Sequence, residues 1–484
     1  MHADLSRWTF QPEQHYSRVV VQQGRVSLDA DANAQASIVL HYLRALAADL
    51  IGEFGGPSDN LGFVITTGTS AQGKATLSIS PGHYYVDGLL CEAGGTLAID
   101  YFQQPDGYGA LPDLPDTGAY LVWLKLWEGY ISAVEDPNLR EVALGLNGPD
   151  TTGRTQMVWQ VLASPWPPDI DPPTGQQFYD GGWPQAKEQL FPEPKGTLMA
   201  QANLPLPSAD ACTLSPTSGY RGPENQLYRV EIHRGGTAGD DTAPPTFMFS
   251  RDNGSVIASI TRISDSVVSV TTLGRDPQLS IDVGNYVEIV DDEYAAQGEP
   301  GPFLRPAEPL HLVTAVDPVN LTVTLDPAPA PAPAVGQNPA LHPYLRRWDQ
   351  DQVLVTKAGL TIDGIDQAIQ IAGPAVGQWI DLEDGVQVQF SEGTYRAGDY
   401  WLIPARVVTG NVEWPTDANG PLALPPGGVR YHLAPLAFVS GPGAAAVSLQ
   451  LTFAPLTGVG LPAAETPEAS PAPRTSRSTR KSSS

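Results

Sequence analysis

One segment of the sequence nearly matches a phosphate-binding loop. Residues 68–75 read Gly-Thr-Ser-Ala-Gln-Gly-Lys-Ala. Such a loop holds phosphates on its backbone N–H groups and magnesium on a Ser or Thr that follows the lysine. Here Ala75 follows Lys74, and the next residues alternate as a strand toward Pro81. We therefore interpret this segment as the turn of a β-hairpin.

Two groups of acidic residues have the chemistry to bind a divalent cation. Asp29 and Asp31 resemble the start of a calcium loop, but that loop needs Gly and Glu where this chain has Ala34 and Leu40. Capping of a helix explains these two aspartates better. The second group is denser and contains Glu288, Asp291, Asp292 and Glu293. It follows a strand, so either a cation site or a solvated turn remains open, with the turn favoured.

The residues needed for a complete active site are not found. The eight histidines never take a zinc-enzyme spacing, and no Gly-x-Ser-x-Gly elbow occurs. Carboxylates are abundant enough for the acid and base of a polysaccharide-cleaving enzyme, but their pairing depends on the fold. We therefore predict a protein that is not an enzyme, with no catalytic, metal or cofactor-binding residues and no cofactor.

One strongly helical segment lies near the N-terminus. It runs from about residue 32 to 54, is rich in Ala and Leu, and repeats Ile38, Tyr42 and Leu46 at four-residue steps. Residues 18–22 and 25–28 precede it and flank a Gln-Gly turn, which predicts a short hairpin. A single amphipathic helix on a hairpin cannot bury its own apolar stripe. It must therefore pack on the rest of the chain or on another protein.

The remainder of the chain reads as short β-strands. Runs of β-branched and aromatic residues are broken by Gly, Pro, Asp or Asn, which predicts a mainly β, multi-domain protein of antiparallel sandwich or barrel modules. The pattern divides the chain into a docking hairpin and helix (1–60), a β domain (61–165), a Pro/Gly-rich linker loop (166–200), the first part of a second β domain (201–275), a small inserted β-barrel (276–335), a C-terminal β domain (336–456) and a disordered, basic Ser/Pro-rich tail (457–484).

Composition restricts the class of partner. The chain has 484 residues, and its 48 Gly and 47 Pro indicate many turns, while 53 acidic against 27 basic residues give a formal charge of −26. This charge opposes contact with nucleic acid or anionic lipid. No apolar stretch is long enough to span a membrane, so we expect no direct membrane insertion. Cys91 and Cys212 are too few for a disulfide framework and are expected as reduced, buried thiols.

Several stretches combine arginines with Asp, Glu and Asn in tight turns, and Arg251-Asp252-Asn253 is one example. Arginine forms two parallel hydrogen bonds with a carboxylate, so such residues can fasten loops to the ends of sheets. We interpret these stretches as structural rather than as ligand sites.

Six sequence blocks resemble a bacterial family known mostly as a domain of unknown function and found in gene clusters of phage-tail-like contractile injection systems. The first block, at 16–33, reads YSRVVVQQGRVSLDADAN. The others lie at 140–161, 219–233, 249–256, 342–349 and 398–406. Together they span about residues 8–455, which is nearly the whole predicted folded part. The family supplies no catalytic residues to carry over.

The resemblance implies a structural protein at or around the baseplate or spike of a contractile particle. Baseplate, spike or sheath-proximal proteins would be its partners, with multiple copies per particle. The chain would be made in the bacterial cytoplasm and assembled into particles that stay there or are released on lysis. The predicted partner-binding residues lie in the hairpin and helix and are Arg18, Val20, Arg25, Ile38, Tyr42 and Leu46.

Two alternatives remain open from the sequence. The first is a glycan- or cell-envelope-binding module of the same particle, in which exposed indole rings would stack on sugars. The candidate rings are Trp348, Trp379, Trp401 and Trp414. A row of exposed rings would favour this function, and burial in the core would oppose it. The second alternative is the polysaccharide-cleaving tail enzyme.

Overall fold

The computed structural model describes residues 1–106, 111–145, 149–167, 171–173, 175–202, 219–240, 242–274, 276–296, 308–351 and 360–454. The described residues form many short strands and few helices, which confirms the predicted mainly β class with one long N-terminal helix. No helix in these ranges combines the length and the apolar character needed to cross a membrane. Cys91 is a buried free thiol, while Cys212 and the predicted tail lie outside the described residues.

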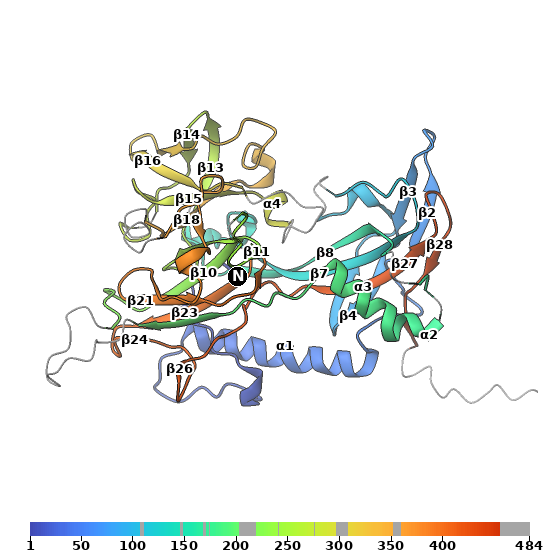
Figure 1. The fold of residues 1–484 in the computed structure, drawn as a ribbon, viewed down its shortest axis with the longest axis horizontal. Coiled ribbons are helices and arrows are strands. Elements are labelled where there is room, and N and C mark those ends of the chain that lie inside the picture. The colour runs from blue at the N-terminus through green and yellow to red at the C-terminus, as the bar shows by residue number, and fades with distance from the viewer. Residues whose placement is uncertain are drawn as a thin grey trace, which may run out of the picture.

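The first strand unit occupies the right side of Figure 1 and encloses the largest hydrophobic core. Its sheets follow the orders β29-β1-β4-β5, β2-β3-β6 and β28-β27-β7-β8. The strands are β1 (Phe54–Pro57), β2 (Ile65–Thr69), β3 (Ala75–Ile79), β4 (Gly82–Val86), β5 (Leu89–Ala93), β6 (Ile99–Asp100), β7 (Tyr120–Ile131), β8 (Arg154–Pro165), β27 (His432–Val439), β28 (Ala446–Ser448) and β29 (Thr452–Phe453). Residues 68–75 form the β2–β3 hairpin, as interpreted from the sequence.

The last strands of the chain complete this first unit. β27 pairs antiparallel with β7, and β29 pairs parallel with β1. The first eight residues of β7 are all buried, so this strand needs a neighbour on each edge, and β8 and β27 supply them. The expected C-terminal domain at 336–456 is therefore divided, because β27 to β29 join the core formed by residues 61–165 while its other strands belong to other sheets.

The expected linker loop at 166–200 holds helical turns and a strand. The elements are α2 (Gly175–Gln177), the π-helical η5 (Phe178–Gly182), α3 (Trp183–Leu190) and β9 (Leu198–Ala202). Phe178, Trp183 and Ala186 are buried in the core of the first unit. The Pro, Gly and Gln content of this segment shows no helical period. Its helical turns are instead held against the sheet by the burial of these three side chains.

The second strand unit occupies the lower left of Figure 1 and has its own core. Its sheets follow the orders β19-β12-β10-β23-β24, β20-β21-β9, β11-β22 and β25-β26. The strands besides β9 are β10 (Gln226–Arg234), β11 (Gly236–Thr237), β12 (Thr246–Ser250), β19 (Ile369–Gln370), β20 (Ile380–Asp381), β21 (Val386–Phe390), β22 (Thr394–Tyr395), β23 (Tyr400–Arg406), β24 (Asn411–Val412), β25 (Thr416–Asp417) and β26 (Gly420–Pro421).

A closed six-stranded barrel is inserted into the second unit and lies at the upper left of Figure 1. Its order is β13-β14-β17-β16-β15-β18. The strands are β13 (Ile257–Ser264), β14 (Val267–Val270), β15 (Tyr286–Val290), β16 (His311–Asp317), β17 (Thr322–Asp326) and β18 (Tyr344–Trp348), with α4 (Asp292–Ala296) after β15. It extends beyond the expected 276–335 on both sides because β13 pairs with β18 to close it.

The long helix α1 (Asp29–Ile51) lies along one side of the molecule, below both strand units in Figure 1. Short 3-10 helices complete the described structure: η1 (Pro12–Gln14), η2 (Tyr101–Gln103), η3 (Pro137–Leu139), η4 (Val142–Leu144), η6 (Pro339–Leu341) and η7 (Gly373–Ala375).

Candidate partner-binding site

The sequence around α1 fixes where this helix begins and ends. Asp29 and Asp31 lie in its first turn, where negative charge is favourable at a helix N-terminus. Gly52 ends the helix with a φ of +95°, and its N–H donates to the Ala48 carbonyl at 2.8 Å. The helix starts and stops three residues earlier than expected, since the predicted span was about 32–54.

Small side chains make up part of the inner face of α1. Ala30 and Ile38 are buried, and Ala34 and Ala48 are half-buried. Small residues let the helix approach closely at Gly88, where an added Cβ would lie 2.1 Å from the Arg44 carbonyl oxygen. The backbone of the helix therefore comes very close to the first unit at Gly88.

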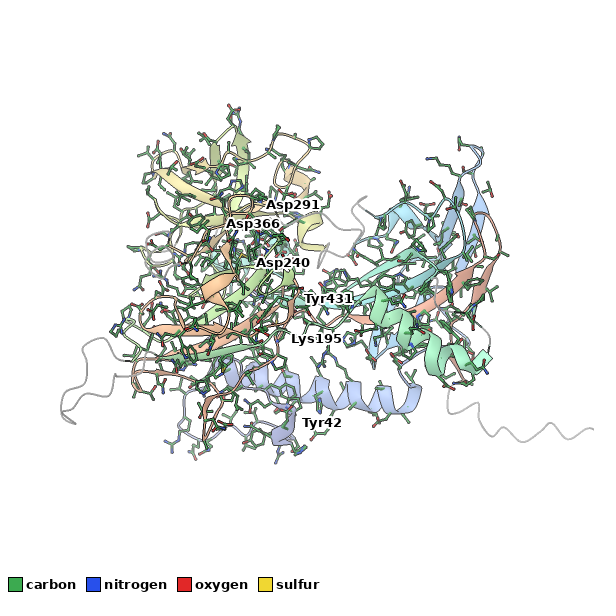
Figure 2. All side chains as sticks on the ribbon, viewed as in Figure 1. Tyr42, Lys195, Asp240, Asp291, Asp366 and Tyr431 are labelled. Carbon is green, nitrogen blue, oxygen red and sulfur yellow. The ribbon has the colours of Figure 1, made fainter. Side chains whose placement is uncertain are left out.

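The outer face of α1 carries large apolar side chains that are exposed. They are Val39, Tyr42, Leu43, Leu46 and Leu50, which we call the outer stripe. Their spacing of i, i+3, i+4, i+7 and i+11 places them in one row along the helix. Tyr42 is 49% exposed, Leu46 58% and Leu50 66%, and Figure 2 shows Tyr42 on the side of α1 away from the strand units. An apolar row facing solvent on a well-formed helix is typical of an interaction surface.

The segment before α1 adds more exposed apolar residues. Tyr16, Val20, Val21, Val26 and Leu28 are all exposed. The predicted turn at Gln-Gly 23–24 is present, but no strands flank it. The predicted hairpin is therefore wrong. The Val19 N–H donates to the Gln35 side chain on α1 at 2.8 Å instead of to a partner strand.

Residues 1–7 fasten this region to the second unit. The N–H and hydroxyl of Ser6 donate to the Asp29 carboxylate at 3.0 and 2.7 Å. The Ser6 carbonyl accepts from Arg406 at 3.0 Å, and the Ala3 carbonyl accepts from Asn253 at 2.7 Å. The start of α1 is thus held on the second unit, while its inner face packs on the first.

A paired ion bridge fixes the middle of the helix. Arg44 on α1 donates to both carboxylate oxygens of Glu128 on β7, at 2.7 and 3.0 Å. Such a two-bond pair sets orientation as well as distance. The helix is therefore a rigid support for the outer stripe rather than a loosely attached element.

The structure separates the predicted partner-binding residues into two groups. Arg18, Val20 and Arg25 are exposed in the segment before α1, and Tyr42 and Leu46 are exposed on the outer stripe. Ile38 is 3% exposed and packs inward, so it supports the helix and is not available to a partner.

Sequence reasoning did not select Val39, Leu43 or Leu50 as binding residues, although they complete the stripe. A search for large apolar residues at helical spacing from Tyr42 and Leu46 would have found them, because all five lie in one row.

The four candidate tryptophans do not form an exposed row. Trp348 and Trp401 are buried in hydrophobic cores, and the Trp401 indole N–H donates to the Leu424 carbonyl at 3.0 Å. Trp379 is 36% exposed, and Trp414 is half-buried. Sugar stacking needs a free ring face, so Trp348 and Trp401 cannot take part in it.

The acidic group after β15 is divided among separate partners. Glu288 accepts from the Trp348 indole N–H at 3.2 Å, and Asp291 accepts from the N–H of Gly336 at 2.8 Å. Asp292 bonds to His342 at 2.8 Å. Among the residues that the structure describes, no three His, Cys, Asp or Glu side chains come together as metal ligands.

Arginines tie the barrel to the second unit, in keeping with the structural interpretation of the sequence. Arg347 on β18 pairs with Asp252 at 2.9 Å and with Asp349 at 3.0 Å. Arg251 pairs with Glu383 at 2.7 Å. Burial raises the pKa of Glu383 to about 8, and this effect outweighs the nearby Arg251 guanidinium. Burial likewise raises the pKa of Asp252 to about 6.

Comparison with known proteins identifies a family. A family model described as "Family of unknown function (DUF6519)" matches residues 1–163 and 193–475. The matched ranges include α1, the segment before it and the strands of both units and the barrel. The searches of curated proteins and of solved structures found no match.

Proposed function

We propose that this chain, which belongs to the DUF6519 family of unknown function, is a structural subunit of a phage-tail-like contractile particle. In this proposal it lies at or around the baseplate or spike, in several copies, and acts by binding neighbouring subunits. The particle context comes from the resemblance of the six sequence blocks. The assembly role is supported by the molecule itself.

The observation that carries the assembly role is the outer stripe. Five large apolar side chains lie in one row on a helix that is braced against both strand units. The segment that precedes the helix in the sequence carries further exposed apolar residues. Water contact with this much apolar surface is unfavourable, and burial recovers about 25 cal/mol for each Å² covered. A second protein surface would bury the outer stripe.

Charge narrows the chemistry of that partner. The chain carries a formal charge of −26, so its field repels nucleic acid, anionic lipid and other strongly acidic surfaces. We propose a partner with an apolar helix or groove rimmed by Lys and Arg, on a baseplate, spike or sheath-proximal protein. Assembly then follows synthesis in the bacterial cytoplasm, without nucleic acid contact or membrane insertion.

The double variant Leu43→Glu, Leu46→Glu tests the docking role in cells that lack the wild-type chain. We prefer it to deletion of the N-terminal region, because β1 begins only three residues after α1 ends and Phe54 is a core residue. Both leucines are exposed, so folding should be unchanged, whereas charges on the stripe should lower incorporation into purified particles at least about tenfold.

The matched control is Leu97→Glu, Val319→Glu. These two residues are 79% and 89% exposed and lie outside α1, so the control adds the same charge elsewhere and should incorporate normally. Equal incorporation of both double variants would contradict docking through the stripe. A wild-type chain that never sediments with particles would contradict the particle context.

A further inference from the structure

Four residues of the outer stripe have the spacing of one side of a two-helix coiled coil. Val39, Leu43, Leu46 and Leu50 recur at steps of four, three and four residues, which are the d and a positions of a heptad repeat written abcdefg. We call these four residues the seam. At 3.6 residues per turn, their side chains lie within about 60° of one another around the helix axis. Helices that pair side by side need this spacing, whereas a strand or loop partner does not.

The side of α1 opposite the seam packs on the protein. Ile38, Arg44 and Ala48 fall at the c, b and f positions of the same repeat, and none of them is exposed. Arg44 bonds to Glu128 on β7. All four residues of the seam are exposed, at 46% for Val39 and more for the three leucines. The helix is therefore attached by one side and leaves the seam in solvent.

The side chains around the seam outline the spaces that a facing helix would fill. In a coiled coil, each a or d side chain enters a space between four side chains of the other helix. The first set of four on α1 is Val39, Tyr42, Leu43 and Leu46, and the second is Leu43, Leu46, Ala47 and Leu50. Every member is exposed except Ala47, which is half-buried. Residues 39–50 extend over about 18 Å, so a partner helix of about three turns would cover both sets.

The short seam is sufficient because α1 is already folded. Isolated helices of fewer than about 12 to 15 residues are marginal in water, so two free peptides of this length would not pair well. Here the 23-residue helix is bound to the first unit through Arg44 and to the second through Ser6 and Asp29. A partner therefore binds a surface that needs no further ordering, which lowers the cost of association.

Charge distinguishes a different subunit from a second copy of this chain. Two copies would bring together two formal charges of −26, which repel. The e and g positions beside the seam hold Leu40, Tyr42, Ala47 and Asp49, so the charge at its margin is negative as well. Asp49 is exposed. Charges at e and g positions pair across a coiled coil, so this margin favours a Lys or Arg on the facing helix.

We infer that the outer stripe pairs with a single α-helix of a different subunit, which carries apolar residues at its a and d positions and a basic residue facing Asp49. The inference rests on the proposed docking role and specifies the element that docks. The interface is a coiled coil of about three turns, and α1 is its preformed half.

Fluorescence anisotropy of a labelled peptide mixed with the full chain tests this inference. The peptide has three heptads, with Leu at a and d and Lys at e and g, and its lysines repel a second copy of the peptide. A second peptide has the same composition but its leucines are moved out of the heptad spacing. We expect saturable binding of the first peptide and at least about tenfold weaker binding of the second.

The variant Leu43→Glu, Leu46→Glu separates the seam from general attraction between charges. It makes the chain more acidic, so charge alone would strengthen binding of the basic peptide, whereas loss of the seam should weaken binding at least about tenfold. The matched control is Leu97→Glu, Val319→Glu, which adds the same charge away from α1 and should not weaken binding. All four residues are exposed, so both double variants should fold.

Equal binding of the two peptides, no binding of the heptad peptide, or equal affinity of the two double variants would each overturn the inference. Sedimentation of the wild-type chain as a dimer that Leu43→Glu, Leu46→Glu dissociates would also overturn it, because the stripe would then belong to a second copy. The docking role itself is judged separately, by incorporation of the same variant into particles.

Discussion

Charged side chains pair with one another where the barrel joins the second unit, and Arg347 and Asp349 among them are buried. Arg347 is 4% exposed and forms ion pairs with two carboxylates, and Arg251 forms an ion pair with Glu383. Removing a carboxylate partner of Arg347 would leave a buried guanidinium charge less compensated, which is costly. All of these residues except Glu383 come from the sequence blocks at 249–256 and 342–349, which supports the structural interpretation of these blocks.

Glu383→Gln tests the charge balance at this joint. The pKa of Glu383 is raised from 4.5 to about 8, so the folded state keeps a proton that the unfolded chain has lost. The stabilising contribution is therefore full below about pH 4.5 and is lost as the pH rises toward about 8. Gln stays neutral, so relative to wild type the unfolding free energy of the variant should rise by about 4 kcal/mol between about pH 5 and about pH 8.5.

Urea titration at several pH values measures this gain. Glu392→Gln serves as the control, because Glu392 is exposed and its replacement should change stability equally at every pH. A stability difference for Glu383→Gln that stays flat across the same range would contradict the buried, neutral state of this carboxyl.

At the scale of elements, α1 leaves most of its large apolar side chains exposed. Ala30, Ala34 and Ala48 face the protein together with Ile38, whereas the outer stripe faces solvent. Alanine permits close backbone approach and favours the helix at the same time. The large apolar side chains of the outer stripe are therefore exposed, and this exposure is the basis of the proposed docking role.

Gly88→Ala tests how α1 is attached. Gly88 and Gly73 both have left-handed φ, at +76° and +80°, so alanine costs about 1 kcal/mol of backbone strain at either site. Only at Gly88 does the new Cβ meet the helix, at the Arg44 carbonyl. We expect Gly88→Ala to lose about 1 to 3 kcal/mol more than Gly73→Ala and to speed amide exchange along α1. Equal losses and unchanged exchange would contradict the close approach.

Local patterns predicted some elements well and others poorly. The four-residue period found α1, because this signal is contained within the element. The helical turns at 175–190 were not predicted, since their order comes from burial of Phe178 and Trp183 in a distant core. The outward orientation of the stripe was also not readable, because it depends on which helix face meets Gly88.

At the scale of the whole molecule, the last strands of the chain pair with strands near its start. Strands β27 to β29 complete the first unit, although the second unit and the barrel lie between them and β8 in the sequence. Local sequence patterns carry no information about pairing between distant segments. The expected domains were therefore continuous stretches of sequence, whereas the first unit combines two distant stretches. The result is one connected body in which α1 is held against both strand units.

The measurement that tests the central claim most directly is a cryo-EM map of the contractile particle, purified from cells that produce this chain. The account predicts density for the chain at the baseplate or spike end. It also predicts that the outer stripe is covered by a neighbouring subunit whose apolar surface is rimmed by basic residues. Density in which the chain is present but Tyr42, Leu46 and Leu50 face solvent would contradict the account, as would a particle that lacks the chain.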